Sequence, residues 1–168
     1  LAWNGATNKW QPYTNDSRIL QVVSVTKTDT FSAAANGTPL SVTGLAATIS
    51  PLSTSNKVLI IAQISYASSG TTYGGWFRRG ATDLGRGDAA SNRQRVGMGL
   101  AYTSDANQIN SFHYSFLDSP GTTSATTYQF FANNDNANVI YINRSVTDGD
   151  SATGKRASST VTLMEVAS

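Results

Sequence analysis

The segment GDSATGKR, residues 149–156, places Gly149, Gly154 and Lys155 at the spacing of a phosphate-binding loop. Such a loop needs Ser or Thr directly after the lysine to hold magnesium, and a helix whose first amides cradle the phosphates. Here Arg156 takes the Ser/Thr position, and the residues that follow, ASSTVTLMEV, alternate as a strand does. We therefore predict a strand, a loop and a second strand at this place, with no nucleotide site.

Other catalytic constellations are also missing from the sequence. His113 is the only histidine, no G-x-S-x-G elbow is present, and Glu165 is the only glutamate. The chain has no cysteine, which removes thiolate chemistry, thiolate metal sites and disulfides. We predict a protein that is not an enzyme.

Carboxylates in loops raise the question of calcium. Asp148 and Asp150 could ligate this ion together with Asp118 or Asp135, because calcium takes carboxylate and carbonyl oxygens from loops. The spacing of an EF-hand is missing, and TDGD is also ordinary turn chemistry. We predict neither a metal nor a cofactor.

The densest group of charges lies in FRRGATDLGRGDAASNRQR, residues 77–95. Arginine binds carboxylates and phosphates bidentately, so this cluster could recognise an anionic ligand. The alternative is pairing between arginines and aspartates that fixes loops or the boundary between subunits, and we favour it. The cluster of interface or structural charges that we predict is Arg78, Arg79, Arg86, Asp88, Arg93 and Arg95.

Aromatic and amide side chains suggest a place for a glycan. Aromatic faces stack on sugar rings, and amides bond to sugar hydroxyls. The residues that could do so are Tyr73, Trp76, Asn133, Asn134, Asp135 and Asn136. The competing interpretation makes Trp76 a core residue and the Asn run a hairpin turn.

The amino-acid composition limits the classes of partner that the chain is expected to bind. Charged residues make up 13% of the 168 residues and the net charge is +2, which does not favour a nucleic-acid binder. There is no apolar run long enough to cross a bilayer, so we expect no membrane insertion. At this length a single domain can bury about 70% of its unfolded surface and form a substantial core.

The pattern along the chain predicts an all-β protein. Short β-branched and aromatic runs alternate with clusters of Gly, Asn, Asp, Ser and Pro, as in an antiparallel β-sandwich of the jelly-roll type. The strands that we expect are residues 19–26, 40–49, 57–67, 75–79, 95–103, 109–117, 126–132, 138–144 and 158–166.

Several of these strands are apolar on both faces. In KVLIIAQISYA, Val58, Ile60 and Ile64 lie on one face, yet Leu59 and Ile61 make part of the other face apolar too. An antiparallel strand with one wet face should alternate apolar and polar residues. We expect a neighbouring subunit to cover the second face.

Residues 1–18 differ from the rest of the chain. Trp3 and Trp10 flank an Asn-Gly turn at Asn4 and Gly5, which predicts a small hairpin. We expect a hairpin and linker over 1–18, connecting to the rest of a larger particle, and a jelly-roll head domain over 19–168. A hydrophobic clamp on the main domain is the alternative for the hairpin.

Three blocks taken in order, FRRGATDLGRGDAASNRQR, SFLDSPGTTSATTYQFF and YINRSVTDGDSATGKRASSTVTLMEV, resemble a module of tailed-bacteriophage structural proteins, especially the C-terminal heads of tail fibres. The first block matches F-x-R-G-x-T-x-L-G-x-G-D at Phe77, Arg79, Gly80, Thr82, Leu84, Gly85, Gly87 and Asp88. The other blocks match at Leu117, Asp118, Ser119 and Pro120, and at Tyr141, Ile142, Asn143, Arg144 and Ser145.

This resemblance implies a head like those of tumour necrosis factor and complement C1q, usually a homotrimer, carried on the virion surface among other phage virion proteins. It implies a non-enzymatic tail-fibre or tail-tip head that mediates attachment to the host. The alternative is a capsid cement or decoration protein that stabilises the phage head.

Overall fold

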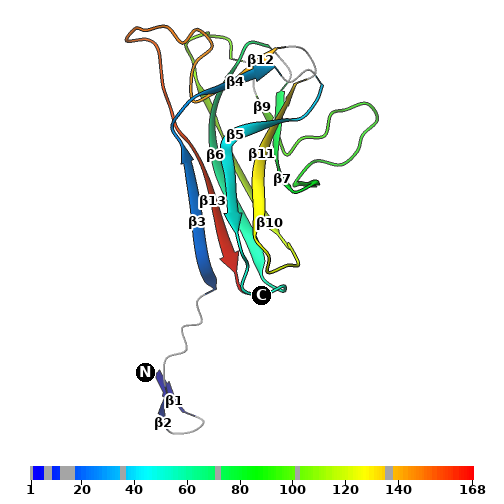
Figure 1. The fold of residues 1–168 in the computed structure, drawn as a ribbon, viewed down its shortest axis with the longest axis vertical. Coiled ribbons are helices and arrows are strands. Elements are labelled where there is room, and N and C mark those ends of the chain that lie inside the picture. The colour runs from blue at the N-terminus through cyan, green and yellow to red at the C-terminus, as the bar shows by residue number, and fades with distance from the viewer. Residues whose placement is uncertain are drawn as a thin grey trace.

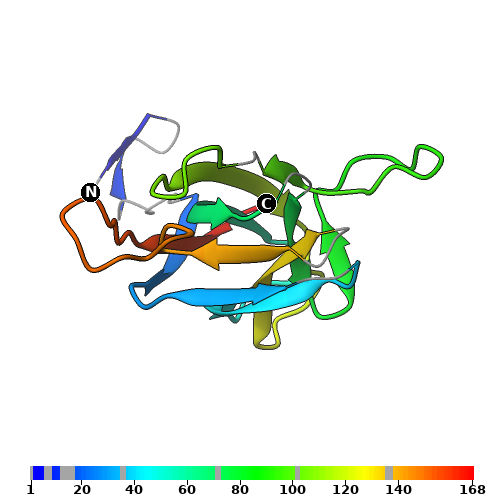
Figure 2. The ribbon, with the colours of Figure 1, turned by 90° about the horizontal axis from the view of Figure 1, so that it is seen from above.

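The computed structural model describes residues 2–5, 9–11, 18–34, 37–70, 73–100, 103–134 and 138–168. These residues form strands, turns and loops with no helix, and the strands are arranged in two large sheets that face each other (Figures 1 and 2). Because no described helix exists, none is long and apolar enough to span a membrane. The prediction of an all-β chain is confirmed.

The first sheet, named here the β6 sheet after its central strand, has six antiparallel strands. Its central strand, β6 (Lys57–Ser68), is paired on both sides. On one side, β13 pairs with residues 57–63 of β6 and β12 pairs with residues 66–68, while β3 pairs with the far side of β13 and β4 with the far side of β12. On the other side, β10 pairs with residues 58–66 of β6. The other strands of this sheet are β3 (Ile19–Lys27), β4 (Phe31–Ala34), β10 (Asn110–Asp118), β12 (Val139–Ile142) and β13 (Ser159–Val166).

The second sheet, the β11 sheet, has five antiparallel strands in the order β5-β11-β7-β8, with β9 also on β7. Its strands are β5 (Leu40–Ile49), β7 (Tyr73–Arg79), β8 (Thr82–Leu84), β9 (Met98–Leu100) and β11 (Thr126–Asn134). The chain crosses between sheets at β4 to β5, β5 to β6, β6 to β7, β9 to β10, β10 to β11 and β11 to β12. Such repeated crossing with antiparallel neighbours is the jelly-roll arrangement, as the sequence predicted.

The core lies between the sheets. On β6 the predicted inner face is buried, with Val58, Ile60 and Ile64 at 0% exposure. From the β11 sheet, Phe77 and Phe130 meet it as a ring pair with centroids 5.5 Å apart. Aromatic pairs at this spacing add to the burial of apolar area, so this cluster holds the two sheets together.

Each predicted strand has a counterpart, and apart from the strand expected at 95–103 the bounds differ by at most two residues. The strand expected at 75–79 begins earlier, at Tyr73, and the one expected at 95–103 is only Met98–Leu100. Two short strands, β4 and β8, were not predicted. FSAA and TDL are too short to show a period, and tertiary pairing with β12 and β7 decides their conformation.

The predicted N-terminal hairpin is present as β1 (Ala2–Asn4) and β2 (Lys9–Gln11), with Trp3 opposite Trp10. Asn4 is the last residue of β1 and pairs with Lys9, so of the predicted Asn-Gly turn only Gly5 lies in a turn. These strands form their own two-stranded sheet, apart from the two large ones. The division of the chain at residue 18 remains a prediction.

Candidate functional site

The outward face of the β6 sheet carries an apolar row across its strands. Leu117 of β10 is opposite Leu59 of β6, Leu59 is opposite Met164 of β13, and Met164 is opposite Val22 of β3. Val22 is 54% exposed and Leu117 46%. We call these four residues the apolar row; they are the second apolar face that the sequence predicted.

Towards the loop end of the sheet, the face becomes polar but stays largely uncharged. Ser115, Ile61, Thr162 and Ser24 form the next row in register, and the Ser24 and Thr162 hydroxyls lie 3.0 Å apart. The row beyond contains His113, which is exposed and opposite Gln63, as its alternating run predicted. This face thus combines exposed apolar side chains with hydroxyls and few charges.

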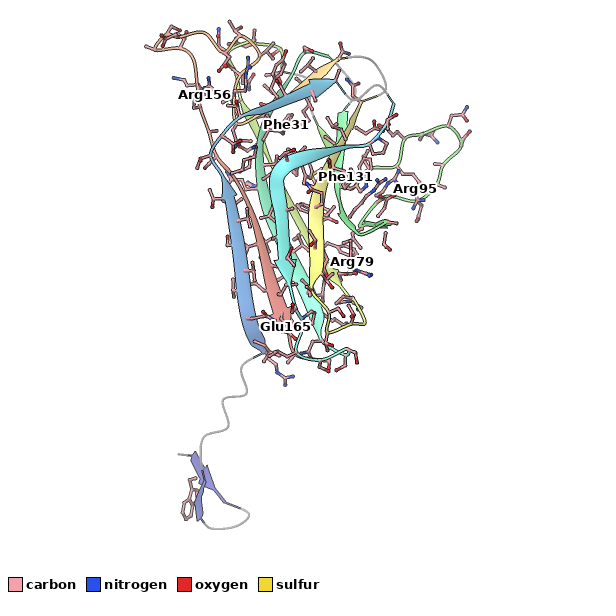
Figure 3. All side chains as sticks on the ribbon, viewed as in Figure 1. Phe31, Arg79, Arg95, Phe131, Arg156 and Glu165 are labelled. Carbon is pink, nitrogen blue, oxygen red and sulfur yellow. The ribbon has the colours of Figure 1, made fainter. Side chains whose placement is uncertain are left out.

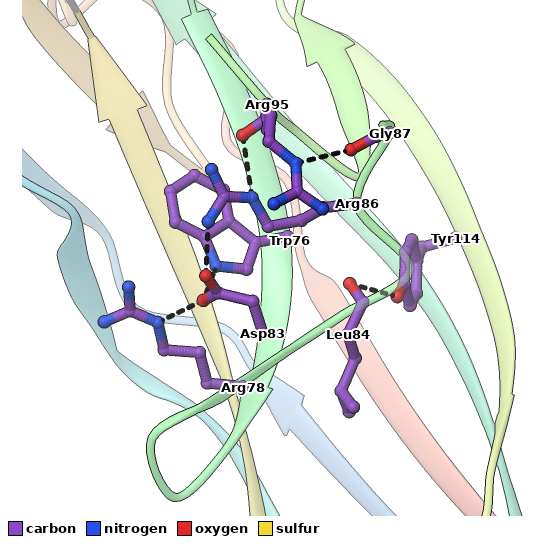
Figure 4. Close-up of polar contacts among 8 residues, drawn as sticks. All are labelled: Trp76, Arg78, Asp83, Leu84, Arg86, Gly87, Arg95 and Tyr114. Carbon is purple, nitrogen blue, oxygen red and sulfur yellow. Dashed lines mark hydrogen bonds and ion pairs between the residues drawn. The ribbon is translucent and has the colours of Figure 1, made fainter. Parts of the chain in front are cut away.

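The outward face of the β11 sheet is different, because an arginine and aspartate network covers it (Figures 3 and 4). Asp83 accepts hydrogen bonds from Arg78 Nε at 2.6 Å, from Trp76 Nε1 at 2.6 Å and from Arg86 Nη1. Burial raises the pKa of Asp83, but the bonds from Arg78, Trp76 and Arg86 outweigh it and hold the pKa below its usual value. The carboxylate therefore stays ionised and joins both guanidinium groups.

Aromatic rings complete the network. The guanidinium carbon of Arg86 lies 4.6 Å from the Trp76 ring centre, and that of Arg78 lies 4.4 Å from the Phe131 ring centre. Cations over aromatic faces are attracted by the ring quadrupole. Trp76, although it points outward from β7, is consequently only 1% exposed.

Two arginines also close the base of the loop at residues 85–97, which projects from the sandwich (Figures 1 and 2). Arg86 Nε donates to Arg95 O at 2.8 Å, and Arg95 Nε donates to Gly87 O at 2.7 Å (Figure 4). Arg93 and Asp88 are exposed on the loop. Neither residue joins an ion pair among the described residues, and the interface role predicted for both remains a prediction.

Arg79 forms a separate, deeper pair. Its Nε donates to Asp118 Oδ2 at 2.7 Å, and the Tyr128 hydroxyl donates to the same oxygen at 2.8 Å. Burial and this hydrogen bond raise the pKa of Tyr128 far above its usual value. The predicted pairing of arginines with acids is confirmed for Arg78, Arg79 and Arg86, while a role at a subunit boundary remains a prediction.

The first and second of the three sequence blocks meet through the Arg79 ion pair, since Arg79 belongs to the first block and Asp118 to the second. Gly80 and Gly85 of the first block have φ values of 58° and 56°, in the left-handed region that favours glycine. A Cβ on Gly85 would also lie 2.5 Å from the Tyr114 hydroxyl. These motif residues thus fix turns and packing.

The predicted glycan residues are mostly buried. Trp76 is 1% exposed, Asn133 5% and Asn134 0%. Asn134 Nδ2 donates to Asn138 O at 2.9 Å, and Asn133 Oδ1 accepts from Asn134 N at 2.8 Å. Stacking on Trp76 and amide bonding to a ligand were therefore wrong for these three residues, because their rings and amides are used within the fold.

The remaining members of that predicted set are not covered by the described structure. Asp135 and Asn136 lie outside the described residues, and so does the side chain of Tyr73.

The GDSATGKR segment lies in the loop between β12 and β13, and no helix follows it. The prediction of strand, loop and strand is confirmed, and the helix that a phosphate-binding loop requires is absent here. Asn143 opens the loop with a φ of 62°. Its Nδ2 donates to Lys27 O at 2.8 Å and to Asp29 O at 2.9 Å, and its Oδ1 accepts from Ser159 Oγ at 2.6 Å. One buried amide thus joins the ends of β3 and β13.

Two of the four aspartates considered for calcium have other partners; of the other two, Asp150 is exposed and Asp135 lies outside the described residues. Asp148 pairs with Arg156 at 2.9 Å and with Arg144 at 3.4 Å, and Asp118 is held by Arg79. Within the described ranges, no group of three or more His, Asp or Glu residues could hold a metal ion.

Glu165 forms a polar site that the sequence did not reveal. It is 0% exposed, and its carboxylate accepts from Gln21 Nε2 at 2.6 Å, Asn56 Nδ2 at 2.6 Å and Leu52 N at 2.7 Å (Figure 3). Burial raises the pKa of Glu165, but these bonds outweigh it and hold the pKa below its usual value. The partners are distant in sequence, so only the register of β13 with β3 and β6 brings them together.

Comparison with known proteins yields distant likenesses only. No protein-family model matches the chain, and no curated protein does. Similar solved structures include infectious bursal disease virus, Gx strain, with a TM-score of 0.43 and 14% identity over 88% of this chain and 37% of that one. Another is the VP2 subviral particle of the same virus, with a TM-score of 0.42 and 10% identity over 88% and 38%. The chain thus spans little more than a third of these capsid chains, and likenesses this weak do not decide its function.

Proposed function

We propose that the chain is the head domain of a virion structural protein, a trimeric, non-enzymatic tail-fibre or tail-tip head that contacts the host surface. The apolar row on the β6 sheet is the observation that carries this proposal. The resemblance of the three sequence blocks to phage tail-fibre heads supplies the class of particle.

The apolar row supports self-association because of its composition. Val22 and Leu117 are about half exposed, and the rows beside them contribute Ile61, at 42%, with hydroxyls rather than charges. Soluble monomers rarely expose apolar side chains in a continuous group, and such groups mark interfaces. A second and third copy of this chain are the occupants that we propose, because self-association commonly gives closed symmetric homo-oligomers and the tail-fibre heads that the chain resembles are usually trimers.

The geometry of the motif blocks supports a structural rather than catalytic role. Their charged residues, Arg79, Asp118 and Arg144, are engaged in ion pairs or in bonds to backbone carbonyls. Gly80, Gly85 and Gly121 of the blocks have positive φ values. These residues are used within the fold, which supports a structural role for them.

The experiment that tests this function locates the protein on its particle. Gold-labelled antibody against residues 18–168 should mark the tail tip in electron micrographs, and the isolated protein should compete with the phage for adsorption to host cells. Labelling of the whole capsid shell, with hundreds of copies per particle, would favour the decoration protein instead. Absence of the protein from purified particles would overturn both.

A further inference from the structure

A groove of about 520 Å³ lies between two loops on the described surface. One wall is the loop that leads into β10 and the other is the GDSATGKR loop before β13 (Figure 1). The lining residues are Asp105, Asn107, Gln108 and Ile109 from the first loop, and Ala152, Thr153 and Lys155 from the second. Its volume falls within the range of about 300–1,000 Å³ that is typical of small-ligand sites.

Both walls are held in place by contacts outside the groove. Thr147 N donates to Ala106 O at 3.0 Å, which ties one loop to the other. Asp148 is clamped by Arg144 and Arg156 at the base of the second loop. A Cβ on Gly154 would collide with the carbonyl oxygen of Gly149, so this loop closes on itself in a way that only glycine allows. The groove is therefore preformed, which lowers the entropic cost of binding.

The two charged groups in the groove, on Lys155 and Asp105, are only partly engaged in contacts within the chain. Lys155 Nζ has a bond of 3.3 Å to Ala152 O and joins none of the described ion pairs. Asp105 Oδ1 accepts from Asn107 N at 2.9 Å and leaves the second carboxylate oxygen for a ligand. The arginines beside Asp83, Asp118 and Asp148, by contrast, are already engaged with these carboxylates within the chain.

The lining selects one class of ligand. Amides and a hydroxyl both donate and accept hydrogen bonds, as sugar hydroxyls do, and one carboxylate balances one ammonium. A phosphate group would be repelled by Asp105, while Ile109, Ala152 and the methylene groups of the polar side chains offer apolar surface on which a sugar ring can pack.

We propose that this groove binds a saccharide, with Asp105 accepting from adjacent sugar hydroxyls and Lys155 donating to ring or hydroxyl oxygens. The inference rests on the proposed contact of the head with its host, and it places that contact on residues other than those predicted from the sequence.

The test uses the whole 168-residue protein on an array of bacterial surface oligosaccharides, built from neutral hexoses, N-acetylhexosamines and uronic acids. We expect binding to at least one structure, and titration of that oligosaccharide should move the backbone amide resonances of residues 105–109 and 152–155. Asp105→Ala and Lys155→Ala should each weaken binding about tenfold, since each loses a charged hydrogen bond. Lys57→Ala removes the same charge from an exposed lysine at the first residue of β6 and should bind as the parent does.

A failure of the groove proposal can be distinguished from a failure of the proposed virion role. A protein that forms trimers and labels the tail but binds no saccharide on the array would overturn the groove proposal alone. Binding that survives in both groove variants, or shifts that map elsewhere, would also overturn it. Circular dichroism of both variants should match the parent, because neither side chain is buried.

Discussion

The two outward faces of the sandwich differ in how far their apolar side chains are covered. On the β11 sheet, Trp76 and Phe131 are covered by Arg78 and Arg86, which both pair with Asp83 of the same chain. On the β6 sheet, Val22 and Leu117 have no such cover and remain about half exposed. The apolar side chains of the first face are thus covered within one chain, whereas those of the second face are the surface on which we propose that further copies of the chain pack.

The same contrast exists along β13, where neighbouring residues face opposite ways. Leu163 is 0% exposed in the core, and Met164 lies in the apolar row. Leu163→Ala should lower the free energy of unfolding by about 2–5 kcal/mol, because it opens a cavity. Met164→Ala should cost the fold less than about 1 kcal/mol and weaken association instead. Urea denaturation at several protein concentrations measures both effects. An equal loss of unfolding free energy in the two variants would contradict the proposed difference between the faces.

Arg79→Ala tests whether the arginines are structural. Removing the guanidinium leaves the Asp118 carboxylate, 7% exposed, with Tyr128 as its remaining described partner. We expect a loss of about 3 kcal/mol, typical of a broken buried pair. Arg93→Ala, which changes an exposed arginine of the projecting loop, is the matched control and should be near neutral. Unchanged thermal stability of Arg79→Ala together with lost host adsorption would favour an anionic ligand site.

Glu165 predicts a dependence of stability on pH. Its pKa in the folded protein is lowered below the ordinary 4.5, so its stabilising contribution is present above pH 4.5 and is lost as the pH falls through the folded pKa. Glu165→Gln should reduce stability at pH 7 and flatten the decline between pH 4.5 and lower values. A parent and variant with parallel stability curves over that range would show that Asn56, Gln21 and the Leu52 amide do not favour the ionised form.

Lys155→Ala should have the smallest effect on stability, within about 0.5 kcal/mol, because the side chain is exposed. Calorimetry of the parent with ATP and magnesium should give no binding heat, because the loop lacks both the helix and the hydroxyl that a phosphate site requires. A measurable heat that disappears in Lys155→Ala would contradict the assignment of this loop.

The fold was largely predictable because the longer strands alternate over at least seven residues, as in β10 and β13. The short strands β4 and β8 carry no such signal, and pairing with longer strands decides them. The apolar row was also predictable in part, since Leu59 and Ile61 break the alternation of β6. Its continuation through Leu117, Met164 and Val22 depends on register, which the sequence does not encode locally.

The site residues were harder to predict. In the sequence, a tryptophan beside arginines can either stack on a sugar ring or be buried under the guanidinium groups. Trp76 is buried because Asp83, on the neighbouring strand β8, accepts a hydrogen bond from its indole nitrogen. Glu165 looked isolated because its partners are far away in sequence, such as Asn56 at a separation of 109 residues. The saccharide groove likewise joins two loops that no local motif connects.

The most direct test of the central claim, that the outward face of the β6 sheet is a homotrimer interface, is the solution mass of the protein. Multi-angle light scattering at micromolar concentration should give three times the 17.8 kDa mass of the chain. Leu117→Glu, which puts a charge into the apolar row, should give single folded chains, whereas Thr127→Glu on the exposed outer side of β11 should remain a trimer. A monodisperse monomer of the parent protein would contradict the account and leave the apolar row without its proposed partner.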